Sequence, residues 1–152
     1  MKALTYESWI IEYDDMFTQQ ILKNVVSGPQ SCGCGNCKNF ILARDKVYPD
    51  DLKKLLEQLG IDYQKETEIC HFNRIKAGQH FYGGWFHFVG EIKETFEDKV
   101  INIGGRVPDI ENFAWSFSER HDLVPKEFGQ APVVQLDWLA VVPWLMESEE
   151  PT

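Results

Sequence analysis

The spacing of apolar residues changes at Gly60, and this change limits the fold more than any other feature of the chain. Before Gly60, four leucines follow the i, i+3, i+4, i+7 spacing of a helix with one buried face: Leu52, Leu55, Leu56 and Leu59. Pro49 suits the first turn of such a helix, and Gly60 suits its end. We therefore predict a helix over residues 49–59 whose leucines belong to the core.

Strand patterns dominate after Gly60. Segments rich in aromatic and β-branched residues predict strands over 69–76, 80–93, 100–103, 113–118 and 133–142. The paired glycines Gly83-Gly84 predict a bulge or a tight bend within the second of these. Residues 4–26 read as helical in part, after strand-like residues near Ile10. Helices first and strands after predict an α+β fold, with N-terminal helices packed on a mainly antiparallel β-sheet.

Length and composition predict one domain. The chain has 152 residues, of which 43% are hydrophobic, and this suffices for a core. We place the domain at residues 1–147 and regard the polar residues 148–152 as a frayed tail. No apolar run approaches the ~20 residues that cross a membrane, and the N-terminus turns acidic too early for a signal peptide. We therefore expect a soluble, cytoplasmic protein without a membrane partner.

The formal net charge of −9 bears on the choice of partner. A protein that binds nucleic acid gains much of its affinity by neutralising phosphates with basic side chains, so the acidic balance disfavours nucleic acid. The same charge suits a basic protein partner. If the Trp85 face of the strand over 80–93 is exposed, it provides an aromatic patch for a partner.

Three of the four cysteines lie within residues 31–37, which read SCGCGNC. Neighbouring cysteines in a C-x-C are poorly placed for a disulfide because their side chains diverge. Each thiolate of a metal site, in contrast, only has to reach one ion at ~2.3 Å. The glycines allow the turns that point several sulfurs inward. We therefore predict that Cys32, Cys34 and Cys37 bind a zinc-type ion.

A closed zinc site has four ligands, so a fourth has to come from elsewhere in the chain. The candidates are Cys70, which would complete a site of four cysteines, and His71, which would complete a site of three cysteines and one histidine. The residues alone leave both open. In this interpretation the protein is not an enzyme: the ion pins the cysteine loop to the sheet, contributes to folding and preorganises a protein-interaction surface.

Two other interpretations of the cysteines stay open. Cys34 and Cys37 form a C-x-x-C similar to a thioredoxin-type redox pair, and a helix that starts there would lower the pKa of Cys34. The strand of a βαβ unit that precedes such a motif is missing from the pattern. In the second alternative the cysteines bind nothing, and the chain is a metal-free acidic inhibitor or immunity-type protein that occludes a basic toxin or nuclease.

The sequence assigns no catalytic residue. His87 and Glu91 share a strand face by period two, and such a pair can transfer protons. A histidine on a sheet face more often packs or pairs there, and no G-x-S-x-G motif supplies a nucleophile. The Gly104-Gly105 pair lacks the spacing of a phosphate-binding loop.

Four blocks of the sequence form a set: Cys34-x-x-Cys37-x-Asn39-Phe40, Leu59-Gly60-Ile61-Asp62, residues 82–90 (YGGWFHFVG) and Val142-Pro143-Trp144. This set is similar to a family of small bacterial and phage-associated proteins, over about residues 32–144. That family has no established activity, so the resemblance implies no catalytic residues. It implies one compact domain in a bacterial cytoplasm.

Overall fold

The computed structural model describes residues 1–95, 113–148 and 150–151. In chain order its elements are β1 (Lys2–Tyr6), β2 (Trp9–Tyr13), α1 (Asp15–Leu22), α2 (Gly28–Cys32), α3 (Gly35–Val47), α4 (Asp50–Gln58), β3 (Glu68–Lys76), β4 (Gln79–Thr95), β5 (Phe113–Ser118), the 3-10 turn η1 (Lys126–Phe128) and β6 (Val133–Pro143). The strand predicted over 100–103 lies outside the described residues. Among them, no helix has the length and apolar character needed to cross a bilayer.

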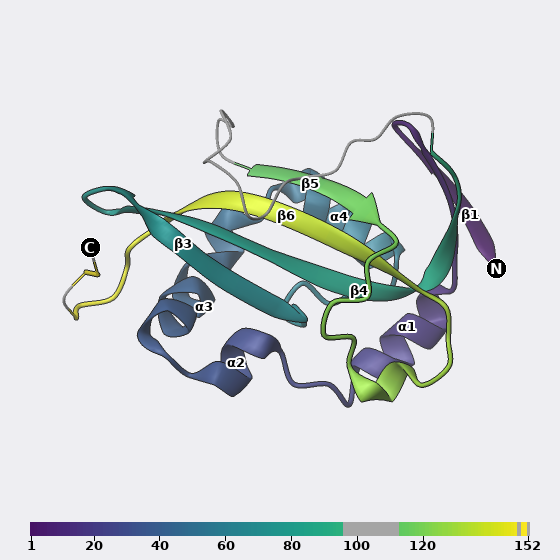
Figure 1. Ribbon diagram of the computed structural model, residues 1–152, viewed down its shortest axis with the longest axis horizontal. Helices are drawn as coiled ribbons and strands as arrows, with labels where there is room; N and C mark the ends of the chain where they lie inside the picture. Colours follow the sequence, from purple (N-terminus) through teal and green to yellow (C-terminus); the bar gives the residue numbers. More distant parts are fainter. Residues whose placement is uncertain (96–112, 149, 152) are drawn as a thin grey trace.

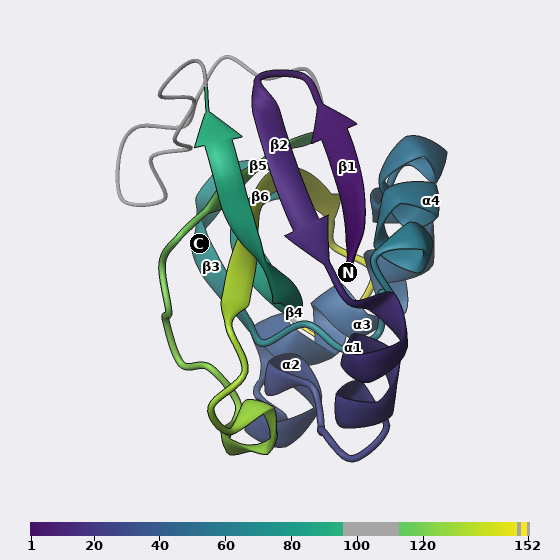
Figure 2. The same ribbon diagram turned by 90° about the vertical axis from the view of Figure 1, so that its right-hand side faces the viewer.

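The strands form a six-stranded sheet in the order β1-β2-β4-β6-β5, with β3 also paired to β4. β4 is 17 residues long, so it pairs with β3 along its first half and with β2 near its end, while β6 follows its other edge. Every pairing among these strands is antiparallel. The helices gather on one side of this sheet (Figure 1 and Figure 2). The predicted α+β fold is confirmed.

The leucine pattern forms a helix with a buried face, as predicted. α4 spans Asp50–Gln58, and the four leucines of the pattern are buried. Gly60 follows at φ +81°, a left-handed conformation, and the Ile61 N–H then donates to the Leu56 carbonyl at 2.8 Å. A glycine is needed there for a second reason: a Cβ at Gly60 would lie 2.0 Å from the Asp15 carbonyl oxygen. The end of α4 therefore fixes how closely α1 approaches it.

The sequence analysis missed one strand, and one of its local predictions was wrong. The segment over residues 4–26, which reads as helical in part, contains β2 and α1, but residues 4–6 belong to β1, which was not predicted. β1 is an edge strand with mostly exposed side chains, so it lacks the apolar alternation that marks a half-buried strand. Gly83-Gly84 is not a bulge, because the pairing of β4 with β6 runs through it without a shift. Gly84 instead lies against the Trp138 ring, which a Cβ would approach to 2.6 Å.

The condition for an aromatic patch on β4 is not met, because the Trp85 face of the strand is covered. Trp85 is 9% exposed and His87 is 1% exposed. The Trp85 Nε1–H donates to the carbonyl of Asp122 at 2.9 Å, and the His87 ring packs against Phe128. The chain between β5 and β6 thus lies over this face of the sheet.

The opposite face of the sheet packs on the helices through aromatic side chains. Phe40 of α3 stacks on Trp138 of β6 with ring centroids 5.2 Å apart, and Tyr48 contacts Phe86 of β4 at 5.8 Å. Such ring pairs add to the free energy of burial. α3, whose first turn contains Cys37, is therefore anchored on the sheet by its central and final turns.

A buried ion pair strengthens this anchor. Arg44 of α3 lies 2.8 Å from a carboxylate oxygen of Glu66, and the Tyr48 hydroxyl donates to the other oxygen at 2.8 Å. Burial raises the pKa of Glu66 to about 7, and Arg44 opposes that shift. A buried carboxylate needs such partners, because an unpaired buried charge strongly destabilises the folded state. The pair joins α3 to the chain that enters β3.

Replacing Gly60 with alanine tests the close approach of α4 and α1. G60A combines an unfavourable positive φ with the collision at Asp15, so we expect the free energy of unfolding to fall by about 2–4 kcal/mol. The matched control is G78A, because Gly78 has φ +79° but no atom within 4 Å of its Cβ position. The free energy of unfolding of G78A should fall by about 1 kcal/mol. Urea denaturation measures the free energy of unfolding of both variants, and equal losses in G60A and G78A would contradict the close packing of Gly60 against Asp15.

Candidate metal centre

The cysteine segment joins two helices instead of forming an open loop. Cys32 is the last residue of α2, and Gly33 follows in the left-handed conformation at φ +66°. Cys34 then caps the N-terminus of α3. The chain reverses within these three residues, which brings Cys32 back toward the first turn of α3. Cys37 lies in that first turn.

The segment brings three sulfur atoms together. The Sγ atoms of Cys32, Cys34 and Cys37 all lie within 4.8 Å of one another. Cys32 and Cys34 are exposed, whereas Cys37 is 6% exposed and belongs to the core. All four cysteines of the chain are free thiols. The three clustered sulfurs can therefore hold one metal ion at the protein surface, with one ligand rooted in the interior.

The thiols of Cys34 and Cys37 differ in acidity because they occupy different positions on α3. The Cys37 N–H donates to the Cys34 Sγ at 3.4 Å, and this hydrogen bond lowers the pKa of Cys34. Burial raises the pKa of Cys37 well above the ordinary value for a thiol. Cys34 is therefore the readier thiolate, and a metal ion is needed to favour the thiolate of Cys37.

The two predicted fourth ligands lie on opposite faces of the sheet. Cys70 of β3 pairs with Gly83, where a Cβ would meet the Phe72 side chain on the face away from the helices. His71 pairs with Tyr82, and their rings pack edge to face on the helix side, 5.0 Å apart. Neither Cys70 nor His71 belongs to the group of atoms within 4.8 Å.

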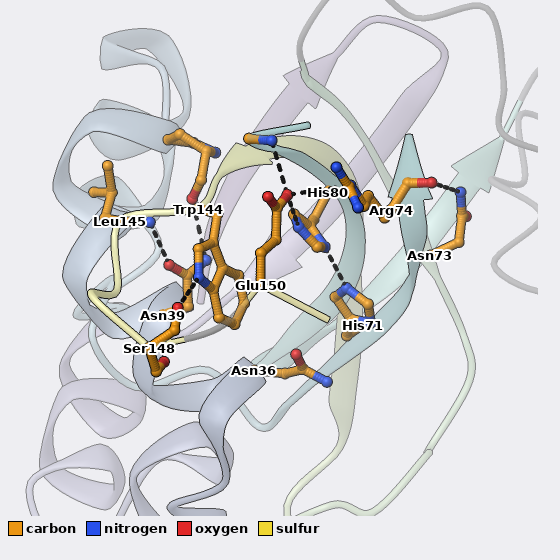
Figure 3. Close-up of polar contacts among 12 residues, drawn as sticks. Asn36, Asn39, His71, Asn73, Arg74, His80, Trp144, Leu145, Ser148 and Glu150 are labelled. Atoms are coloured by element: carbon orange, nitrogen blue, oxygen red, sulfur yellow. Dashed lines mark hydrogen bonds and ion pairs between the residues drawn. The ribbon is translucent and has the colours of Figure 1, made fainter. Parts of the chain in front are cut away.

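His71 belongs to a chain of polar contacts that no sequence pattern indicated. Its Nε2 lies 2.7 Å from the Nδ1 of His80, and the His80 Nε2 lies 2.7 Å from a carboxylate oxygen of Glu150 (Figure 3). Glu150 also accepts from the Gly78 N–H at 2.8 Å. These contacts join the predicted tail to the turn between β3 and β4. His80 and Glu150 are 70 residues apart, and no sequence motif links them. Their contact could therefore be found only from the three-dimensional structure.

Both ring nitrogens of His87, the histidine considered for acid–base catalysis, contact polar side chains within the protein. The Nδ1 of His87 lies 2.8 Å from the Thr67 hydroxyl, and its Nε2 lies 2.9 Å from the Gln135 side-chain oxygen. Burial lowers the pKa of His87 to about 4, so the ring is neutral near pH 7. Glu91 is exposed and accepts a hydrogen bond from Lys93 instead. The two residues therefore do not form a pair.

A cleft of about 890 Å³ lies between α1 and α4. Its charged lining consists of four lysines and four acidic residues: Lys23, Lys53, Lys54, Lys65, Asp15, Asp50, Glu57 and Asp62. Because neither sign predominates, the lining does not select a ligand class. Within the described part of the chain, no cysteine or histidine lines it.

Alkylation by iodoacetamide tests the difference in acidity. The thiolate is the reactive form, so the rate at Cys34 should rise at a lower pH than is usual for a thiol. Cys37 should need a higher pH and react most slowly, because it is both buried and less acidic. Mass spectrometry of the metal-free protein gives the rate at each site, with half-buried Cys70 as an internal reference. Faster labelling of Cys37 than of Cys34 would contradict the geometry.

Comparison with known proteins does not assign this chain to a family. No family model, no curated protein and no solved structure matches the chain. The resemblance to small bacterial and phage-associated proteins therefore stays a prediction, and the function has to be inferred from the residues and their contacts.

Proposed function

We propose that this protein is a thiolate metal-binding domain in which Cys32, Cys34 and Cys37 hold a zinc-type ion. The observation that carries the proposal is the mutual distance of the three Sγ atoms, which is at most 4.8 Å. Sulfurs bound to one tetrahedral zinc ion at ~2.3 Å lie at comparable separations from one another. Thiolates are soft ligands, which favours zinc over magnesium or calcium.

The role of the ion in this proposal is structural. It would fasten the end of α2 to the start of α3, two segments that Gly33 and Cys34 join in the chain. Because Cys37 is buried and the other two cysteines are exposed, the ion would lie at the surface but be fixed to the core. Its binding free energy would then add to the stability of the fold.

A protein partner is part of the same proposal. With the Trp85 face covered, the corner formed by α2 and the first turn of α3 is the surface whose shape the ion would fix. The formal charge of −9 favours a basic partner. Two exposed cysteines at this corner support the idea that a partner can reach it.

Serine substitutions at the cysteines test the metal site. C34S and C37S should each lose stoichiometric zinc, and the rise in melting temperature that zinc gives the parent protein should disappear. C70S is the matched control, since Cys70 lies on the other face of the sheet, and it should bind zinc as the parent does. Comparing each protein with and without zinc separates the metal effect from any cost of a buried hydroxyl at position 37. A parent protein that binds no zinc would refute the proposal.

A dithiol redox function is the second candidate, and one observation favours it. Cys34 is exposed at the N-cap of α3 while Cys37 is buried in its first turn, as in a C-x-x-C pair with an attacking and a resolving thiol. The Cys34 thiolate would attack a substrate disulfide and form a mixed disulfide. Cys37, after losing its proton, would then release the second substrate thiol. The substrate is reduced to a dithiol, and Cys34 and Cys37 become a disulfide.

Equilibration of the metal-free protein with reduced and oxidised glutathione tests this candidate. The redox function predicts a Cys34–Cys37 disulfide that forms at a defined potential and is found by mass spectrometry of peptides. C34S should fold with unchanged stability but lose this disulfide. Formation of mixed glutathione adducts without the internal disulfide would contradict it.

A further inference from the structure

In the neutral form of His80, the polar chain from Glu150 to His71 determines which ring nitrogens of the two histidines carry protons. Glu150 lies against the Gly78 N–H and, at 3.5 Å, the Arg74 guanidinium, so it is held as a carboxylate and can only accept (Figure 3). The His80 Nε2 must therefore donate to it. In neutral His80 the Nδ1 then accepts, so the His71 Nε2 donates in turn. This leaves a lone pair on the Nδ1 of His71.

This nitrogen belongs to the side of the sheet that faces the cysteines. The His71 ring packs against Tyr82, and the Tyr82 hydroxyl donates to the Asn36 carbonyl at 2.8 Å. Asn36 is part of the C-x-x-C between Cys34 and Cys37. His71 is thus connected to the cysteine segment through one side chain. Cys70, its neighbour in sequence, is separated from the cysteines by the sheet.

We propose that His71 is the fourth ligand of the metal, through Nδ1, in a site of three cysteines and one histidine whose imidazole is oriented by His80 and Glu150. This inference rests on the proposed metal function. Metal-bound histidines usually donate their other N–H to a carboxylate, carbonyl or similar acceptor, and the His80–Glu150 pair provides such support here. Three thiolates leave one position of a tetrahedral ion unfilled, and His71 supplies the missing ligand class.

Metal binding in this proposal requires the cysteine segment to move toward β3, because His71 lies outside the 4.8 Å group. The Cβ positions of Gly33 and Gly35 have no atom within 4 Å, so no other part of the chain packs against the turn at these two positions. The rest of α3 is held in place, since the Asn39 side chain donates to the Pro143 carbonyl and accepts from the Leu145 N–H. The proposal therefore places the adjustment in the turn before α3 and in its first residues.

The proposal also gives the C-terminal segment a function. Glu150 supports His80, and the Trp144 ring packs on His80 with centroids 5.0 Å apart. Residues near the end of the described chain would then contribute to metal affinity without touching the ion. Loss of a residue that orients a metal ligand typically weakens binding by about 10–100-fold.

Nuclear magnetic resonance of the full chain loaded with cadmium-113 tests the ligand directly. In 15N-labelled protein we expect scalar coupling between cadmium and one imidazole nitrogen, the Nδ1 of His71, with the proton retained on Nε2. H71A should lose this coupling and bind cadmium and zinc more weakly by about tenfold or more, and E150Q should bind them about tenfold more weakly. H121A is the matched control because His121 is exposed, and its affinity should not change.

The outcomes separate this inference from the metal function itself. Cadmium bound by the cysteines without coupling to His71 would overturn the inference and leave the three-thiolate site intact. Weaker binding in C70S with unchanged binding in H71A would assign the fourth ligand to Cys70 and also overturn it. If the parent protein binds neither cadmium nor zinc, the proposed function fails instead. The spectrum of the parent protein needs no variant, so a folding defect in H71A cannot obscure the result.

Discussion

The pairing of β4 along both of its edges is the constraint on which the rest of the structure depends. β4 joins β2 and β3 on one side and β6 on the other, so every other layer is placed relative to it. Successive side chains of β4 point to opposite faces of the sheet. Tyr82 and Phe86 face the helices, while Trp85 and His87 lie under the chain between β5 and β6. Both faces are thus buried, which explains the long apolar run of this strand.

The same strand places the candidate site. Tyr82 reaches from β4 to the Asn36 carbonyl at the start of α3, and the His80 ring, from two residues earlier in β4, contacts His71 as Tyr82 does. The body of α3 is fixed by the stacking of Phe40 on Trp138 and by its buried ion pair with Glu66. The cysteines, in contrast, lie where Gly33 and Gly35 flank Cys34. Because the body of α3 is fixed by packing, Cys37 in its first turn has a defined position in the candidate site.

The sequence predicted the features that depend on local pattern. The leucines of α4 and the three clustered cysteines follow from spacing alone, because residues within one or two helical turns stay close together in any fold. It could not say whether Cys70 or His71 lies on the same side of the sheet as the cysteines, since adjacent residues of a strand point to opposite faces and the sequence does not say which face the helices cover. The contact of His80 with Glu150 joins positions 70 residues apart and needed the tertiary structure. The exposure of Trp85 likewise depended on a loop whose path no pattern specifies.

Whether the clustered cysteines hold an ion is the central question, and the metal content of the purified, untagged protein answers it most directly. Inductively coupled plasma mass spectrometry should find close to one zinc per chain. A thiol titration of the same sample should find Cys32, Cys34 and Cys37 protected until a chelator is added. A sample without metal, in which these three thiols react freely and zinc added afterwards is not retained, would contradict the account.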